Sequence, residues 1–415
     1  MTRSQKQEYF NTITAPKLAG MVGVAEPWRA ARLSRRFAYF ADQDRLVVVA
    51  GEQEASDVDL ALAYGLTWRA GRHLVLVLPE ELAFATLQRA PWLRDDARPT
   101  IWLHDGKEAW NVRGATALET TQGLKERLGE RTPVEEFSEA NMPLHLNSRA
   151  ASVFGLVEWA TSHPALDNAH RQGERAWHCR GQKVLRIVRR HRAGIVEITA
   201  GIHGSGDRAP FHTTLGIGEA LEPGTLADVQ AWVAKGIEDR LHGSCHRPDE
   251  HWLQSVIRTD PSLVGVEQPA LREVPAWRPK QDATRPKRSR TNWSRGYLDL
   301  AGLDGHGNIR LVETKLAKNQ DPLLVFQGLD YYVWAQAYEE ALHERLGAHR
   351  DARLEIHYVI GEPSGTAAVK LSRFAEAQIR SLDRSIPWRF HVVAGWFDDG
   401  VAPQAEMLAE SLIPR

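Results

Sequence analysis

The chain of 415 residues is poor in sulfur-containing residues and has no long apolar run. Its two cysteines, Cys179 and Cys245, do not make a disulfide framework, which favours a reducing compartment. No run is apolar and long enough to cross a membrane, and residues 1–6 lack the apolar core of a signal peptide. We therefore expect a cytoplasmic protein with no membrane partner.

The net charge is also close to zero, because 52 basic residues are balanced by 53 acidic ones. This balance excludes a chain that binds polyanions through its overall charge, so any nucleic-acid surface must be local. The glycine-rich fingerprints of dinucleotide and P-loop sites are absent as well. The hydrophobic fraction of 43% is that of an ordinary globular protein, and the length predicts two or three domains.

The N-terminal part, residues 1–145, is predicted to be an α/β domain with a parallel, Rossmann-like sheet. Apolar runs at 45–51, 73–79 and 99–104 predict strands, and helical periodicity at 56–70 and 80–90 predicts helices between them. Strands that are apolar on both faces and alternate with helices indicate a parallel sheet. Ligands of such sheets lie beyond the carboxyl ends of the strands. A small-molecule ligand, a partner protein and a purely supporting role all stay open.

Residues 146–245 predict a small α+β module. Strand patterns occupy 176–190 and 194–201, and helical spacing occupies 226–241. The basic run from Arg186 to Arg192 has two interpretations, a phosphate-facing patch or the charged protection of a sheet edge. Histidines and a cysteine follow at 242–251, but their spacing matches no standard zinc site. We interpret that segment as a loop.

A hairpin in the C-terminal part carries the most informative residues. Residues 296–302 and 308–315 are predicted strands, and the Gly-rich turn between them is a strong hairpin signal. Asp299 lies on the first strand, and Glu313 and Lys315 lie on the second. Carboxylates at the ends of adjacent strands bind hard cations such as Mg²⁺, and a lysine beside them orients a water molecule. This combination suits the hydrolysis of a phosphodiester.

A second predicted helix follows the hairpin. Asp321 stands before a proline, which predicts a helix start with Asp321 as the capping residue. Gln327 and Tyr331 are four residues apart on this helix and therefore share one face. An apolar run at 354–361 predicts the next strand.

An Asp on the first strand, Glu-x-Lys on the second and Gln-x-x-x-Tyr on the following helix resemble the PD-(D/E)xK nuclease superfamily. The branch in question includes the nuclease domains of recombination helicase–nucleases. The resemblance covers about residues 246–365 and implies a C-terminal domain, residues 246–415, with a restriction-endonuclease-like core. That core consists of a helix, three strands, a helix and a strand. Leu298 stands where the family usually has proline.

The family also requires a leading helix with an acidic residue. The segment 249–261 has helical spacing, and proline closes it. Glu250 is the expected site residue, and Asp249 is the alternative. Acidic residues also favour the first turn of any helix, so Glu250 could stand there for that reason alone.

The resemblance implies a metal-dependent deoxyribonuclease. Asp299, Glu313 and the Thr314 carbonyl would bind Mg²⁺, for which Mn²⁺ could substitute, with Glu250 in support. Lys315 would position water, and Gln327 and Tyr331 would brace the site. DNA is the expected substrate, RNA stays open, and so does a homo-oligomer. The alternative is a module that keeps the fold and binds DNA or protein without turnover.

A basic segment leads into the hairpin. Between residues 278 and 295, seven basic side chains face one acid, Asp282. Basic side chains there could neutralise phosphates, and an aromatic ring could stack on a base. The residues expected to contact nucleic acid are Lys287, Arg288, Arg290, Trp293 and Arg295. A solvated loop is the alternative.

Fold-level analogy adds a hypothesis about biology. Domains of the general shape expected for residues 1–145 act as sensors fused to nucleases in some bacterial defence effectors. A defence or repair nuclease controlled by its N-terminal domain is therefore the expectation.

Overall fold

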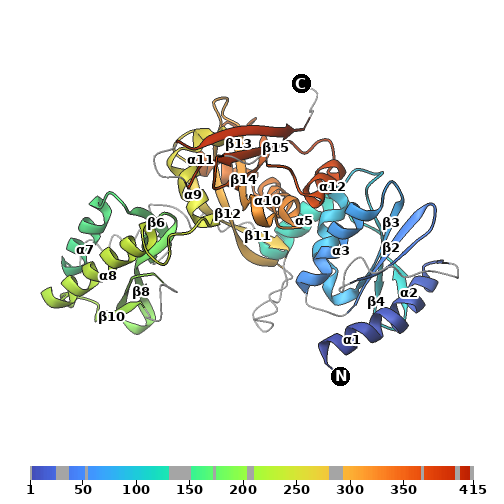
Figure 1. The fold of residues 1–415 in the computed structure, drawn as a ribbon, viewed down its shortest axis with the longest axis horizontal. Helices are drawn as coiled ribbons and strands as arrows, with labels where there is room; N and C mark the ends of the chain where they lie inside the picture. Colours follow the sequence, from blue (N-terminus) through green and yellow to red (C-terminus); the bar gives the residue numbers. More distant parts are fainter. Residues whose placement is uncertain are drawn as a thin grey trace.

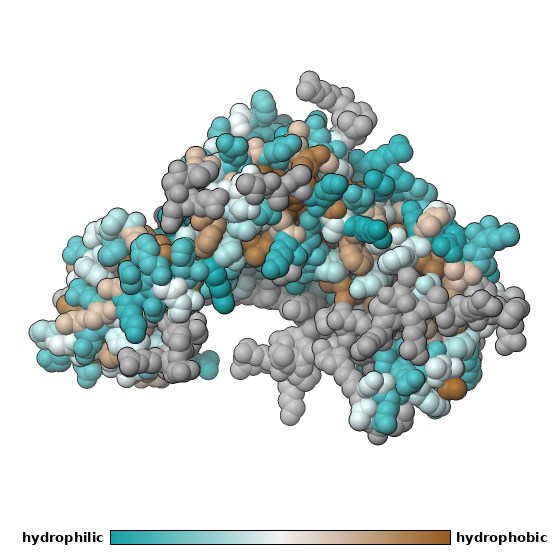
Figure 2. Space-filling model, viewed as in Figure 1, coloured by the Kyte–Doolittle hydropathy of each residue, from teal (hydrophilic) through white to brown (hydrophobic). Residues whose placement is uncertain are grey.

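The computed structural model describes residues 2–24, 37–51, 55–129, 151–171, 174–202, 210–279, 293–365, 369–397 and 402–411. Within these ranges the protein is mixed α/β and contains three sheets. The N-terminal and middle parts lie on opposite sides of the C-terminal part (Figure 1 and Figure 2). None of the helices within these ranges is long and apolar enough to cross a membrane.

The N-terminal part contains a five-stranded sheet in the order β1-β2-β3-β4-β5. The three strands predicted from the apolar runs are β2, β3 and β4, and they pair in parallel as expected. The elements are α1 (Arg3–Tyr9), a π-helix (Phe10–Thr14), α2 (Ala15–Met21), β1 (Phe37–Ala41), β2 (Arg45–Ala50), α3 (Ala55–Trp68), β3 (His73–Pro79), α4 (Phe84–Arg89), β4 (Thr100–His104), β5 (Ala109–Asn111) and α5 (Ala117–Leu128).

The two edge strands of this sheet are antiparallel, so the expectation of a parallel sheet was wrong at both edges. Short turns cause this, since neighbouring strands joined by a few residues must run in opposite directions. In the first turn Asp42 Oδ1 accepts hydrogen bonds from the amides of Asp44 and Arg45. In the second turn Asp105 Oδ1 accepts from the amides of Lys107 and Glu108.

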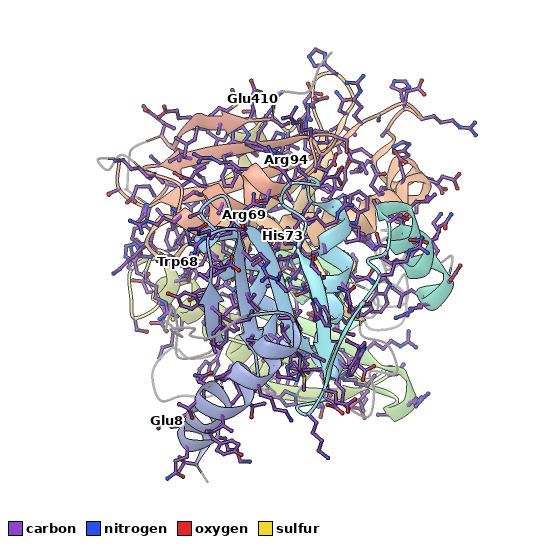
Figure 3. All side chains as sticks on the ribbon, turned by 90° about the vertical axis from the view of Figure 1, so that its right-hand side faces the viewer. Glu8, Trp68, Arg69, His73, Arg94 and Glu410 are labelled. Carbon is purple, nitrogen blue, oxygen red and sulfur yellow. The ribbon has the colours of Figure 1, made fainter. Side chains whose placement is uncertain are left out.

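Helices cover both faces of the sheet, which explains why its inner strands are apolar on both sides. Val47 and Val49 belong to the same hydrophobic cluster as Leu18 of α2. Leu46 and Val48 on the opposite face belong to the cluster that contains α3. Figure 3 shows this part from its outer side, with Glu8 of α1 and His73 at the start of β3 lying toward opposite ends of the sheet.

The middle part is an antiparallel sheet in the order β10-β9-β8-β7-β6, covered by two helices. It has a hydrophobic cluster of its own, in which Val157 and Val233 from the helices meet strand residues such as Trp177. The predicted α+β character is therefore confirmed. The elements are α7 (Ala151–Ser162), β6 (Asp167–Arg171), β7 (Glu174–Cys179), β8 (Gln182–Arg190), β9 (Ile195–Ala200), β10 (Phe211–Gly216) and α8 (Pro223–Leu241).

The C-terminal part contains a six-stranded mixed sheet in the order β11 to β16. Only the β13–β14 and β14–β15 pairs are parallel. The expected order of helix, three strands, helix and strand is present as α9 (Glu250–Thr259), β11 (Leu271–Pro279), β12 (Trp293–Leu303), β13 (Ile309–Leu316), α10 (Leu324–Ala337) and β14 (Leu354–Glu362). The remaining elements are α11 (Glu339–Leu346), α12 (Arg373–Ser381), β15 (Trp388–Ala394) and β16 (Gln404–Glu410).

The start of α10 differs from the prediction. The helix begins at Leu324 with Leu323 in the capping position, two residues later than a cap at Asp321 would place it. Asp321 Oδ1 instead accepts a hydrogen bond of 2.7 Å from the amide of Leu323. A short acidic side chain bonded to the backbone two residues ahead forms a turn, and this turn precedes the helix.

The N-terminal and C-terminal parts share one hydrophobic cluster, whereas the middle part has a separate one. Helices α3 and α12 meet through the rings of Tyr64 and Phe374, whose centroids are 4.9 Å apart. The expected domain boundary at 245 stays a prediction, and the one at 145 lies outside the described residues.

Candidate functional site

The predicted site residues lie at a fork between two strands. Pairing between β12 and β13 extends only from Leu303↔Ile309 to Leu300↔Val312. Beyond this point β12 continues beside β11, and β13 continues beside β14 as far as Leu316. The fork therefore leaves the polar groups of residues 299 and 313–315 free of β12–β13 pairing and available to one another.

Asp299 bridges the fork. Its Oδ2 accepts a hydrogen bond of 2.8 Å from the amide of Thr314 and one of 2.6 Å from the Thr314 hydroxyl. Gln254 of α9 donates to the same hydroxyl oxygen at 3.3 Å. These bonds hold the Asp299 carboxylate against the end of β13, so the two acidic residues predicted for the site are brought together.

The ammonium group of Lys315 contacts three oxygen atoms of the site. Its Nζ lies 3.0 Å from the Thr314 carbonyl, 3.2 Å from Glu250 Oε2 and 3.5 Å from Glu313 Oε1. Burial disfavours the ammonium, but the negative charges of Glu313, Asp299 and Glu250 outweigh burial and raise the pKa of Lys315 above its ordinary value. The side chain is therefore a fixed positive charge and a hydrogen-bond donor at neutral pH.

Glu313 is the most perturbed carboxyl group of the site. It is buried, and burial together with the neighbouring Asp299 charge raises its pKa to about 8, although Lys315 and Arg278 act in the opposite direction. Its Oε2 has no hydrogen-bond partner within the described part of the chain. A buried acid with an unpartnered oxygen beside a second acid fits a hard cation, which favours the charged form and supplies the missing partner.

Tyr331 links α10 to the strand that carries Asp299. Its hydroxyl donates a hydrogen bond of 2.8 Å to the Tyr297 carbonyl. Burial, and next the charge of Glu313, raise the pKa of Tyr331 above its ordinary value, so the phenol keeps its proton. Gln327 lies one turn earlier and donates to Asp321 at 3.5 Å, and its Oε1 is buried with no partner in the described ranges.

Arg278 is a site neighbour that the sequence analysis assigned only to the basic segment. It lies on β11, and its Nη1 is 3.5 Å from the Tyr331 hydroxyl. Burial acts against the charged form, but Tyr331, Asp330 and Glu313 raise the pKa of Arg278. A Cβ at Gly296 would lie 2.8 Å from this arginine side chain, so glycine is needed there. The apolar run that precedes Arg278 is the signal that could have placed it on a strand.

The leading helix settles which of two acidic residues reaches the site. Asp249 is the N-cap of α9, and its Oδ1 accepts a hydrogen bond of 2.9 Å from the Trp252 amide. Glu250, the next residue, places its carboxylate 3.2 Å from Lys315 Nζ. Asp249 is therefore occupied by helix capping, and Glu250 is the acid at the site.

The basic segment is only partly described. Lys287, Arg288 and Arg290 lie outside the described residues. Trp293 and Arg295 lie on β12, where their backbones pair with Pro279 and Trp277 of β11. Their expected contacts with nucleic acid stay predictions.

Two arginines of the second basic run, Arg186 and Arg190, form ion pairs. Arg186 lies 2.9 Å from Glu174, which also pairs with Lys183, and Arg190 lies 2.9 Å from Glu197. The strand that carries these residues, β8, lies between β7 and β9. Protection of a sheet edge is therefore the wrong explanation, since β8 is an inner strand.

The segment with histidines and a cysteine is part of the apolar packing. Cys245 is buried in the hydrophobic cluster of the middle part. The His246 ring lies 5.5 Å from Trp252 and 4.8 Å from Phe397. Across the described residues, no three or more His, Cys, Asp or Glu side chains are grouped to hold a metal ion. Asp299 and Glu313 are two carboxylates, the number through which Mg²⁺ often binds while it keeps several waters.

The carboxyl ends of the N-terminal strands, where a ligand was expected, are covered by Phe10 of the π-helix. A Cβ at Gly51 would lie 3.1 Å from the Phe10 ring. His104 is buried there, with Nε2 2.8 Å from the Ala50 carbonyl and Nδ1 3.0 Å from the Gly106 amide. These side chains fill the position above β2 and β4, and a ligand for this part stays a prediction.

No family model, curated protein or solved structure matches the chain. The geometry of the site residues is therefore the basis for the function proposed below.

Proposed function

We propose that the protein is a metal-dependent nuclease of the PD-(D/E)xK type that hydrolyses phosphodiester bonds of DNA. The observation that carries the proposal is the fork between β12 and β13. It groups Asp299, Glu313 and Lys315 in the order of the family motif, and Glu313 Oε2 has no partner in the described ranges. The proposal includes a restriction-endonuclease-like core from α9 to β14 and a Rossmann-like N-terminal part.

The donor set fits Mg²⁺, with Mn²⁺ as a substitute. Asp299 and Glu313 would hold the ion, the Thr314 carbonyl, which accepts from Lys315 Nζ at 3.0 Å, would be a further oxygen ligand, and Glu250 would support the site through Lys315. When bound, such an ion polarises a phosphate oxygen and lowers the pKa of a bound water. The charge of such a cation would also offset the repulsion between the buried Glu313 and the half-buried Asp299.

Lys315 acts as a donor in this proposal. Because the surrounding acids raise the pKa of Lys315, the ammonium keeps its proton at neutral pH. It therefore orients the attacking water and stabilises negative charge that develops on the phosphate, rather than removing a proton. Tyr331 fixes α10 against the Tyr297 carbonyl and so limits movement of the strand that carries Asp299.

The remaining elements of the proposal are the substrate and the setting. DNA is proposed as the substrate because of the family motif and the basic residues that precede Asp299. Both cysteines are free and buried, which is consistent with the cytoplasm that we propose. The N-terminal part would sense a ligand or bind a partner in a defence or repair context.

A cleavage assay tests the proposal directly. Purified protein is incubated with linear, circular and single-stranded DNA, with Mg²⁺ or with EDTA. We expect cleavage only with metal, and Lys315→Ala should reduce its rate by about a hundredfold or more. Lys318→Ala is the matched control, since Lys318 is an exposed lysine three positions later. This variant should cleave DNA at the wild-type rate.

Two results would contradict the nuclease assignment. Cleavage by Lys315→Ala at the wild-type rate would show that another group does the chemistry. DNA binding without turnover under all metal conditions would favour the alternative of a binding module that keeps the fold.

A further inference from the structure

A buried arginine of the middle part reaches the helix that carries Glu250. Arg240, in the last turn of α8, is completely buried. Its two terminal nitrogens donate to Asp249 Oδ1 and Oδ2 at 2.8 and 2.9 Å. The same nitrogens donate to the carbonyls of Arg180 and Cys245 at 2.8 and 3.0 Å. A bidentate pair of this kind fixes the orientation of both side chains.

The partner of Arg240 is the residue that starts α9. Asp249 caps this helix through the amide of Trp252, and the Arg240 guanidinium also lies 4.7 Å from the centre of the Trp252 ring. Arg240 thus holds both the cap and the first turn of α9. The fit around this turn is close, because a Cβ at Gly181 would lie 1.9 Å from the His251 carbonyl oxygen.

Glu250 lies within this clamped turn, directly after the cap. Its carboxylate meets Lys315 at 3.2 Å and is 40% exposed, so few other contacts fix its position. The later residues Leu253 and Ile257 anchor α9 in an apolar cluster with the sheet. The direction of the first turn therefore decides whether Glu250 reaches Lys315, and Arg240 contacts both the cap and Trp252 of this turn.

We propose that Arg240 is a positioning residue, through which the middle part holds Glu250 against Lys315. The inference rests on the proposed nuclease function. It also gives the middle part a regulatory role, since any movement of α8 or of the β7–β8 turn would shift the first turn of α9. Arg240 does not contact the reacting groups and acts only through Asp249 and Trp252.

A double-mutant cycle tests whether Arg240 acts through Glu250. Arg240→Met is measured in the wild-type and in the Glu250→Gln background, with kcat and KM determined separately for DNA cleavage. We expect kcat to fall by about tenfold or more in the wild-type background, because a small misplacement near the chemistry has effects of this size. In the Glu250→Gln background the further fall should be less than about twofold.

The chain offers a matched control in Arg89→Met. Arg89 also makes a bidentate pair from a buried guanidinium, with both contacts to Asp330 at 2.8 Å, but Asp330 lies on α10. Its loss should therefore change kcat by the same factor in both backgrounds. If Arg240→Met also has equal effects in both backgrounds, its role is only structural and the proposal is overturned.

A second variant covers the case in which Arg240→Met does not fold. Asp249→Ser keeps a side-chain oxygen that caps α9 but loses the bidentate pair. It should show the same dependence on Glu250, and equal effects in both backgrounds would overturn the proposal.

Hydrogen exchange of backbone amides tests the role of Arg240 independently of nuclease activity. The amides of Trp252 and Leu253 should exchange faster in Arg240→Met and Asp249→Ser, and not in Arg89→Met. Fast exchange in a protein that never cleaves DNA would refute the nuclease assignment and leave the clamp in place. Unchanged exchange in both clamp variants would overturn the assignment of Arg240, whatever the activity.

Discussion

The N-terminal and middle parts join the C-terminal part in different ways. The N-terminal part shares a continuous apolar cluster with it, in which residues of α3 and α12 lie together. The middle part has its own core and meets α9 and β11 through three arginines, Arg240, Arg258 and Arg272. A shared apolar core resists separation because separation exposes apolar surface to water. Polar pairs are replaced by water at less cost, so the middle part is the one suited to move.

We call the contacts of these two parts with the C-terminal part the N-terminal joint and the middle joint. Both joints contain a buried arginine paired with an aspartate on a helix that carries site residues. Arg89 reaches Asp330 on α10, next to Tyr331, and Arg240 reaches Asp249 at the start of α9, next to Glu250. The two sides of the site are therefore held by different parts of the chain. Lys315 and Glu313 lie between them, and the following predictions separate the two sides.

The largest effect should come from the N-terminal joint. Asp330→Ala removes the partner of Arg89, and both side chains are at most 4% exposed. The guanidinium would stay buried with its bidentate partner lost and only Asp59, 4.0 Å away, as a remaining counter-charge, so we expect a loss of about 3–5 kcal/mol in the free energy of unfolding. Urea denaturation measures this. A loss below about 1 kcal/mol would mean that the joint opens and that water replaces Asp330.

The next prediction concerns Glu313, which lies between the two joints. The pKa of Glu313 is raised from 4.5 to about 8, and a bound cation requires the ionised form. Mg²⁺ must displace a proton below about pH 8, so its affinity should rise by about tenfold per pH unit up to that value and then level off. Calorimetry at several pH values measures this, and Glu313→Gln should abolish the dependence. A flat profile in the wild type would contradict the assignment of Glu313.

The same group has a consequence for stability. Because the folded pKa of Glu313 lies above the unfolded one, the folded state binds an extra proton between about pH 4.5 and 8. The stabilisation that this extra proton gives to the folded state is complete below about pH 4.5 and is lost as the pH rises through about 8. In metal-free protein, unfolding free energy should therefore fall over this interval more steeply in the wild type than in Glu313→Gln.

A smaller effect is expected on the α10 side of the site. Tyr331→Phe removes the hydroxyl that donates to the Tyr297 carbonyl at 2.8 Å while keeping the ring in its buried place. The loss of this hydrogen bond should cost about 1 kcal/mol of unfolding free energy, and the long 3.5 Å bond from Arg278 Nη1 is lost with it. The prediction would be wrong if Tyr331→Phe were as stable as wild type. Phe326→Leu, which keeps all hydrogen bonds on α10, is a comparison for packing changes alone.

The smallest effect should come from the middle joint. Arg258→Gln removes one of two arginines that pair with Asp167, and Arg272 stays in place to pair with it. The pair is partly exposed, at 27% and 23%, so we expect a change of about 1 kcal/mol or less in global stability. A loss as large as that of Asp330→Ala would remove the distinction between the two joints.

The sequence by itself determined the local elements of this protein. The hairpin of β12 and β13 followed from its turn residues, and α9, β2, β3 and β4 followed from their apolar periodicity. These features depend on residues within one or two turns of each other, which a linear pattern records. The same holds for the order of Asp299, Glu313 and Lys315, since they belong to one hairpin.

Only the tertiary structure decided how these elements cooperate. Arg89 and Asp330 are 241 residues apart, and Arg278 and Tyr331 are 53 apart, so no local pattern predicts their contacts. The fork that leaves Glu313 outside the β12–β13 pairing depends on β12 following β11 while β13 follows β14. The raised pKa of Glu313 likewise needs the burial that the surrounding parts provide. The sequence thus contains the proposed reactive groups, and packing between distant segments fixes their charge and position.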